Sequence, residues 1–274
     1  MYAGIDIGGT KTLVASLDNS GIITQKIRFE TPQNYEFFLH ELRFALHKLD
    51  AKDFHAGGVG APGKIDRQHD RVTYLPNLKM WKDVSLQHDV ERILHCPVII
   101  ENDAKMAALS EAMMVKDTHA KVLYITISTG IGYGLVDSRK IDTDLADLGG
   151  STILVEQHGK LVPWESFASG HAIVERYGKK AQDITDKKTW HAIVRDLKPG
   201  LLELIAVTEP EIIIFGGSVG VYFERFGKIL KEELDPFMIP SMPLPRLKAA
   251  ARPEEAVLFG CYDLAKEAYG AIAR

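Results

Sequence analysis

The stretch Ala3–Leu17, AGIDIGGTKTLVASL, organises the rest of the chain. An apolar run reaches Asp6, passes Gly8–Gly9 and resumes as a second β-rich run, which predicts a hairpin with a tight turn at the glycines. Paired glycines let backbone N–H groups approach an anion, and the hydroxyl of Thr10 and the cation of Lys11 suit phosphate oxygens. Asp6 at the strand end is suited to a hydrated magnesium ion. By itself, the stretch also fits an ordinary glycine hairpin with exposed charges.

Composition indicates a packed protein that works on small molecules. A chain of 274 residues is expected to form two lobes, and its 46% apolar and 26% charged content excludes a disordered chain. A net charge of −4 without a basic block argues against a nucleic-acid partner. No apolar run is long enough to span a bilayer, and no signal peptide is recognisable. The lone cysteines Cys96 and Cys261 indicate reduced thiols and a cytoplasmic location.

Strand and helix patterns alternate along the chain, which favours an α/β architecture. The expected strands include 22–29 and 55–59, and the expected helices cover 35–49, about 84–94, about 190–207 and 254–271. Pro199 and Gly200 are expected to interrupt the helix over 190–207.

The block around residue 103 is the chemical centre of the sequence. A buried strand over 96–100 ends in Glu101, Asn102, Asp103 and Ala104, before a helix of small residues. One interpretation is that Asn102 or Asp103 only caps the helix. The functional interpretation makes Asp103 a general base that activates a hydroxyl for attack on phosphorus, with Asn102 bonded to the same substrate.

Two further glycine turns follow β-rich runs. The run over 121–127 opens into Ser128, Thr129, Gly130, Ile131 and Gly132, a second hydroxyl-and-glycine hairpin that is suited to phosphate. The run over 211–215 ends in Gly216, Gly217 and Ser218, where paired glycines open a helix and let a flat adenosine approach the backbone.

Taken together, these motifs resemble the ROK family of repressors and sugar kinases. DIGGTKT at 6–12, ENDA at 101–104, STGIGYG at 128–134 and FGGSVG at 215–220 match the family's two phosphate motifs, its catalytic block and its adenosine motif. The resemblance implies the two-lobed, actin-like ATPase (ribonuclease H-like) α/β fold, with ATP and sugar bound in a central cleft. The small lobe would cover 1–112, with a helix of about 255–274 packed back on it, and the large lobe 113–254.

The resemblance also assigns residues to ligands. Asp103 would be the catalytic base. The sugar would contact Gly63, Lys64, Asn77, Asn102, Asp103, Asp147 and Glu165, although Asn77 is also a common turn residue and Asp147 also fits a solvated loop charge. ATP and its magnesium ion, the latter near Asp6 through water, would be bound by Asp6, Gly8, Gly9, Thr10, Lys11, Thr12, Ser128, Thr129, Gly130, Ile131, Gly132, Gly216, Gly217 and Ser218.

The chain departs from the family in one segment. Where relatives carry a glutamate and histidine followed by a zinc-binding cysteine cluster, this chain has Asp147, Gly150 and, over 158–170, no cysteine. Only His158 remains nearby, so no structural zinc is expected, and packing of Trp164 and Val162 would replace it.

The resulting expectation is an ATP-dependent hexose kinase, with glucose phosphorylated at the 6-hydroxyl. Alternatives are an N-acetylhexosamine or fructose kinase, because loss of the histidine at Gly150 would enlarge the sugar pocket, or a non-catalytic sugar sensor. The expected partner is a small sugar, with no nucleic acid or membrane. Since relatives are often dimers, the resemblance also implies a homodimer.

Overall fold

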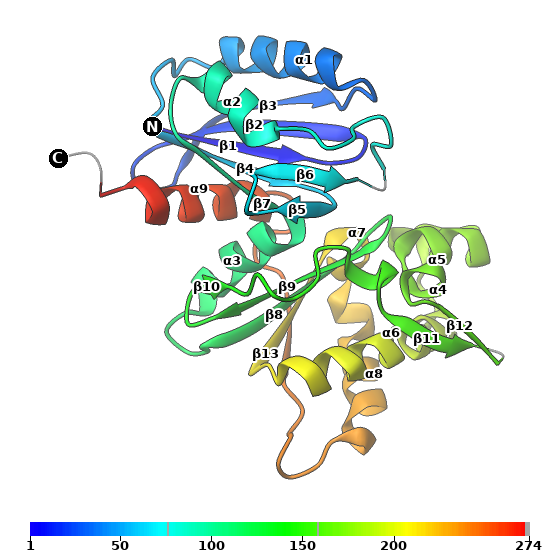
Figure 1. The fold of residues 1–274 in the computed structure, drawn as a ribbon. Helices are drawn as coiled ribbons and strands as arrows, with labels where there is room; N and C mark the ends of the chain where they lie inside the picture. Colours follow the sequence, from blue (N-terminus) through cyan, green and yellow to red (C-terminus); the bar gives the residue numbers. More distant parts are fainter. Residues whose placement is uncertain (76, 158, 272–274) are drawn as a thin grey trace. The chain divides into compact units, whose positions relative to one another are not determined.

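The structure, a computed structural model, describes residues 1–75, 77–157 and 159–271, and in this part of the chain two five-stranded sheets form. Contacts within the chain divide it into two units, and each unit holds one of these sheets (Figure 1). Unit 1 comprises Met1–Ser110 and Glu255–Arg274, and unit 2 comprises Glu111–Glu254. None of the described helices is long and apolar enough to cross a membrane.

The sheet of unit 1 has the strand order β3-β2-β1-β4-β7. Strands β1, β2 and β3 form an antiparallel meander, whereas β1, β4 and β7 run parallel. The elements of this unit are β1 (Tyr2–Ile7), β2 (Lys11–Leu17), β3 (Ile23–Glu30), α1 (Tyr35–Lys48), β4 (Ala56–Ala61), β5 (Lys64–Asp66), β6 (Arg71–Tyr74), α2 (Leu86–Leu94), β7 (Val98–Asn102), α3 (Asp103–Val115, which continues into unit 2) and α9 (Ala256–Tyr269).

Residue alternation along β1 assigns the two faces of this sheet to different helices. Ala3, Ile5 and Ile7 are fully buried in a core shared with α1 and α2, whereas Tyr2 packs in a separate core with α9. Helices α1 and α9 lie on opposite sides of the sheet (Figure 1). Asp6 therefore lies on the α9 face of the sheet, two positions from Gly4. The glycines of that face leave room for α9, because a Cβ on Gly58 would lie 2.4 Å from the carbonyl oxygen of Cys261.

The sheet of unit 2 repeats the plan, in the order β10-β9-β8-β13-β14. Again the first strand, β8, pairs antiparallel with its successor, β9. On its other side β8 pairs parallel with β13, which in turn pairs parallel with β14. Helices α6 and α8 pack on one face of this sheet. The elements are β8 (Lys121–Ile127), β9 (Ile131–Asp137), β10 (Lys140–Ile141), η1 (Gly149–Ser151), β11 (Leu154–Gln157), β12 (Lys160–Pro163), α4 (Glu165–Ala168), α5 (Gly170–Tyr177), η2 (Ala181–Asp183), α6 (Lys187–Thr208), β13 (Ile212–Gly216), α7 (Gly217–Gly220), α8 (Phe223–Leu234), η3 (Asp235–Phe237) and β14 (Arg246–Ala249).

The expected interruption of the helix near residue 200 is wrong, because α6 continues through Pro199 and Gly200. Tertiary packing outweighs the helix-breaking effect of Pro199, because the inner face of α6 is buried along its length. Trp164 is fully buried beside this turn and donates its indole N–H to the Asp196 carbonyl oxygen at 3.1 Å. A Cβ on Gly200 would lie 2.1 Å from the Trp164 ring, so the glycine makes room for the indole.

We therefore expect Gly200→Ala to destabilise the protein, although alanine is the better helix former by about 1 kcal/mol. Contact with the rigid, buried indole outweighs that gain and leaves a net loss of about 1–3 kcal/mol in the free energy of unfolding. In a Trp164→Ala background the ring is absent, and Gly200→Ala should instead stabilise by about 1 kcal/mol. Urea unfolding followed by circular dichroism measures both effects, and the same sign in both backgrounds would refute this packing role.

Candidate active site

Three predicted site segments of unit 1 lie at one edge of its sheet. Strands β1, β4 and β7 are parallel, so their carboxyl ends meet at the same edge. The turn after β1 holds Gly8–Gly9, the loop after β4 holds Gly63, and β7 runs directly into Asp103. The sheet thus gathers the predicted phosphate turn, sugar loop and base from positions about 100 residues apart in the sequence.

The first glycine turn is tight and is needed for space. The N–H of Gly8 donates to the carbonyl oxygen of Lys11 at 2.9 Å, and a Cβ on Gly8 would lie 2.8 Å from that oxygen. A Cβ on Gly9 would lie 2.6 Å from the Cβ of Asn77, so a predicted sugar residue sits against the predicted phosphate turn. Thr10 and Lys11 are exposed at this turn, as a phosphate site requires.

Thr12 faces the interior. Its side chain is fully buried, and its hydroxyl is hydrogen-bonded to the Thr31 hydroxyl at 2.9 Å, which in turn donates to the Gly8 carbonyl oxygen at 2.8 Å. Thr12 therefore supports the turn from behind in this structure. Sequence reasoning missed Thr31, which no motif marks.

Asn102 caps the helix that carries Asp103. Its side-chain oxygen accepts from the N–H groups of Ala104 at 3.1 Å and Lys105 at 3.3 Å, and its amide nitrogen donates to the Gly63 carbonyl oxygen at 3.1 Å. Asn102 therefore caps α3 and also ties the Gly63 loop to β7. Asp103 is the first residue of α3 and is half-buried, with its Oδ1 accepting from the Ala104 N–H at 2.8 Å.

Gly63 and Lys64 begin the β5–β6 hairpin. Gly63 has φ +90°, and a Cβ there would lie 1.9 Å from the Tyr74 carbonyl oxygen, so only glycine fits this position. Lys64 pairs with Tyr74 and its side chain is exposed.

The carboxylate of Asp6 is suited to a cation. Burial raises its pKa to about 7, and the negative charge of Asp103 contributes to the rise. A divalent cation would relieve both effects, so Asp6 fits a magnesium ion held through water. In the described part of the chain, no group of three or more His, Cys, Asp or Glu side chains is arranged to hold a metal. Such an ion would therefore depend on water and substrate phosphates for its other ligands.

Three of the eight predicted nucleotide residues of unit 2 line one cavity. Ser128 and Thr129 of the second glycine turn and Ser218 of α7 border a pocket of about 350 Å³. Gly170, at the start of α5, donates its N–H to the Ser128 carbonyl oxygen at 2.6 Å, and a Cβ there would lie 2.5 Å from that oxygen. The Ile131 N–H, in contrast, donates to Glu165 Oε2 at 3.1 Å. Gly130 precedes that residue in the turn, and Gly132 follows it as the second residue of β9.

The paired glycines after β13 bring the backbone close to its neighbours. A Cβ on Gly216 would lie 2.1 Å from the Tyr124 hydroxyl oxygen. Gly217 has φ +77° and would place a Cβ 2.6 Å from the Ile127 carbonyl oxygen. Together they bring α7 to the carboxyl ends of β8 and β13, where Ser218 reaches the pocket.

Sequence reasoning missed the outer wall of this pocket. Lys180, Gln182 and Tyr222 line it, and the side chain of Arg225 fixes this wall. Arg225 Nη1 lies within hydrogen-bond distance of the carbonyl oxygens of Ala181 (3.1 Å), Gln182 (3.0 Å) and Ile184 (2.8 Å), and its guanidinium lies 4.5 Å from the Tyr222 ring centroid. No motif marks these residues, because they come from a loop and a helix that only the fold brings together.

The segment without cysteines is closely packed. A Cβ on Gly150 would lie 3.0 Å from the Ile131 Cβ and 3.3 Å from the Trp164 ring, so neighbouring side chains fill the space directly beside this glycine. Trp164 belongs to the main core of unit 2, with Val162 packed against that core. His158, the remaining candidate zinc ligand, lies outside the described residues.

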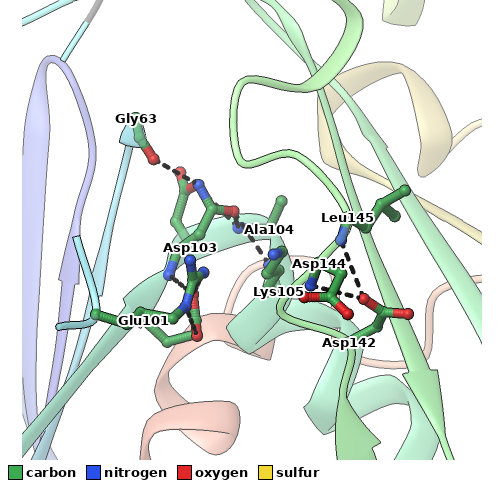
Figure 2. A network of polar contacts seen from close by, with 10 residues as sticks. Gly63, Glu101, Asp103, Ala104, Lys105, Asp142, Asp144 and Leu145 are labelled. Atoms are coloured by element: carbon green, nitrogen blue, oxygen red, sulfur yellow. Dashed lines mark hydrogen bonds and ion pairs between the residues drawn. The ribbon is translucent and has the colours of Figure 1, made fainter. Parts of the chain in front are cut away.

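Asp147 is half-buried and lies close to Tyr133. Burial raises the pKa of Tyr133, its hydrogen bond with Thr152 lowers it, and the charge of Asp147 adds a further rise. The preceding loop is held by Asp142, whose Oδ1 accepts from the N–H groups of Asp144 at 2.9 Å and Leu145 at 3.0 Å (Figure 2). Asp147 is thus not a fully solvated loop charge.

Comparison with known proteins places this arrangement in one family. Residues 2–268 match the ROK family. A glucokinase of Streptomyces coelicolor is 26% identical over 96% of this chain and 97% of its own, and an N-acetylmannosamine kinase of Salmonella typhi is 28% identical over 96% and 97%. The crystal structure of a ROK family glucokinase from Streptomyces griseus, in complex with glucose and AMPPNP, is 25% identical and superposes with a TM-score of 0.80, covering 97% of this chain and 99% of that one. The actin-like ATPase fold expected from the motifs is thereby confirmed. The chain belongs to the ROK family, and sugar kinases match it over nearly its whole length.

Proposed function

We propose that this protein is an ATP-dependent hexose kinase, with glucose as its acceptor at the 6-hydroxyl. The observation that carries the proposal is the carboxyl edge of the unit 1 sheet, where Asp103, Asp6 and the Gly8–Gly9 turn come together. Such an edge offers a base, a cation site and a phosphate turn, the parts that phosphoryl transfer requires. The similarity to glucokinases supports the sugar.

In this mechanism Asp103 accepts the proton of the sugar hydroxyl as that oxygen attacks the terminal phosphorus atom. Asn102 fixes the first turn of α3 and so orients the base. Gly8, Gly9, Thr10 and Lys11 in unit 1 and Ser128, Thr129 and Gly130 in unit 2 would bind the phosphates. Gly216, Gly217 and Ser218 would face the adenosine. Magnesium held near Asp6 would neutralise the charge that develops on the phosphate oxygens.

The sugar would be held by Gly63, Lys64, Asn77, Asn102, Asp147 and Glu165. An N-acetylhexosamine is the second candidate acceptor, because the Salmonella typhi relative is an N-acetylmannosamine kinase. The close packing around Gly150 offers no added room for an acetamido group at that position.

Asp103→Asn should lower kcat by about 10²–10⁴-fold and change the sugar KM much less, since the amide keeps the shape and loses only the base. A coupled ADP-release assay over glucose, mannose, fructose, N-acetylglucosamine and N-acetylmannosamine, with the melting temperature as a folding control, measures this. Full turnover by the Asn variant would remove Asp103 from the role of base. A wild-type protein that binds sugar and nucleotide but turns over none of the panel would instead be a sensor.

Arg225→Ala should raise the ATP KM about tenfold while leaving the sugar KM and kcat at saturating ATP unchanged. The reason is that the wall formed by Ala181–Ile184 loses its side-chain anchor, whereas the acceptor side is untouched. Lys228→Ala is the matched control, because it removes a cation from the same helix with a side chain that is 90% exposed. Equal ATP KM values in the two variants would show either that this pocket does not bind the nucleotide or that Arg225 does not shape it. A Ser218→Trp variant, whose side chain fills the pocket, distinguishes these two explanations when binding of a fluorescent ATP analogue is measured.

A further inference from the structure

Arg67, in the turn between β5 and β6, forms an ion pair with the buried carboxylate of Glu101 near the end of β7. Its Nε donates to Glu101 Oε2 at 2.9 Å and its Nη2 contacts Oε1, so the two side chains form a bidentate ion pair. The side chain of Glu101 is 6% exposed and that of Arg67 is 27% exposed. Such a buried carboxylate needs a charged or well-bonded partner, and the planar guanidinium supplies two parallel bonds.

The same carboxylate reaches the backbone beside the proposed base. Glu101 Oε1 accepts the N–H of Asn102 at 2.6 Å, and Asp103 is the next residue along the chain. The ion pair is thus joined to the junction of β7 and α3, where Asn102 caps the helix. A shift of the Arg67 side chain would be transmitted over one residue to this junction.

The turn that carries Arg67 is itself held rigid. Asp66 Oδ1 accepts from the N–H groups of Gln68 at 3.1 Å and His69 at 3.3 Å, and Oδ2 lies 2.8 Å from His69 Nδ1. These bonds fix the backbone on both sides of Arg67. The hairpin of residues 63–74 is therefore tied to β7 twice, at its start by the bond from Asn102 to Gly63 and at its turn by Arg67.

We infer that Arg67 is a positioning residue that holds the hairpin of residues 63–74 against the end of β7, and so sets the place of Lys64 relative to Asp103. The inference rests on the proposed function, in which Lys64 contacts the sugar and Asp103 takes its proton. Loosening this hairpin should therefore weaken sugar use and leave the nucleotide unaffected. Lysine would restore only part of this contact, because a single ammonium group cannot make both bonds in the same plane.

The test compares Arg67→Met and Arg67→Lys with Arg71→Ala, a control on the same hairpin whose guanidinium pairs with Asp83 at 2.7 Å on the exposed surface. For Arg67→Met we expect the sugar kcat/KM to fall 10–100-fold, with a smaller fall for Arg67→Lys and an ATP KM within twofold of the wild type. Arg71→Ala should change neither value. Hydrogen–deuterium exchange of amides 64–74 should speed up in Arg67→Met, while exchange in α2 stays unchanged.

A double variant separates positioning from the relief of a buried charge. In Arg67→Met/Glu101→Gln the unpaired carboxylate is gone, so the melting temperature should return toward the wild-type value while the sugar kcat/KM remains low. Recovery of both together would show a merely structural ion pair and overturn the inference, as would unchanged exchange over 64–74 in Arg67→Met. If the wild type phosphorylates no sugar, the proposed function fails, and exchange alone then decides whether Arg67 holds the hairpin.

Discussion

The close approach of α9 to the central strands of unit 1 is the constraint on which the candidate active site depends. A Cβ on Gly58 or Gly60 would lie 2.4 Å from α9, and a Cβ on Gly260 would lie 1.9 Å from the Met106 carbonyl oxygen of α3. The absence of three side chains therefore lets α9 pack directly on β4 and against α3. Because α3 begins at Asp103, this packing sets the position of the proposed base relative to β4, with the Asp103 Cα 3.5 Å from a Cβ on Gly60.

One consequence of this packing is electrostatic. Asp6 is paired in register with Gly60 and lies on the same face of the sheet, so the carboxylate is buried beside the negative charge of Asp103. Both effects raise the pKa of Asp6, to about 7, and an uncompensated pair of this kind would oppose the folded state at neutral pH. These two carboxylates are therefore suited to a cation that binds together with the nucleotide phosphates, which is how magnesium is commonly bound at phosphate-transfer sites.

Much of this could be predicted from the sequence, because local chemistry determines it. Short motifs predict the two glycine hairpins, the β7–α3 junction and the family. The structure forms both hairpins and the junction at those motifs, and the match to the ROK family confirms the family. The continuity of α6 through Pro199 could not be predicted, because it depends on burial of the helix face and on the fit of Trp164 into the space at Gly200. Arg225 and Arg67 were missed for a similar reason, since their partners lie more than 30 residues away and no spacing rule connects them.

The two units hold their glycine turns in place with different side chains. Each has a glycine turn between the first two antiparallel strands of its sheet, and each turn sits at the carboxyl end of a parallel neighbour. In unit 1 the turn is supported from behind by the Thr12–Thr31 hydroxyl pair, and its outer residues stay exposed. In unit 2 the turn is held by Glu165 on the Ile131 N–H and by Gly170 on the Ser128 carbonyl oxygen, which places α4 and α5 against it. Because Glu165 is also a proposed sugar contact, a ligand that draws its carboxylate away would release a backbone donor in the second turn, and the sugar and phosphate sites would then be coupled through one side chain.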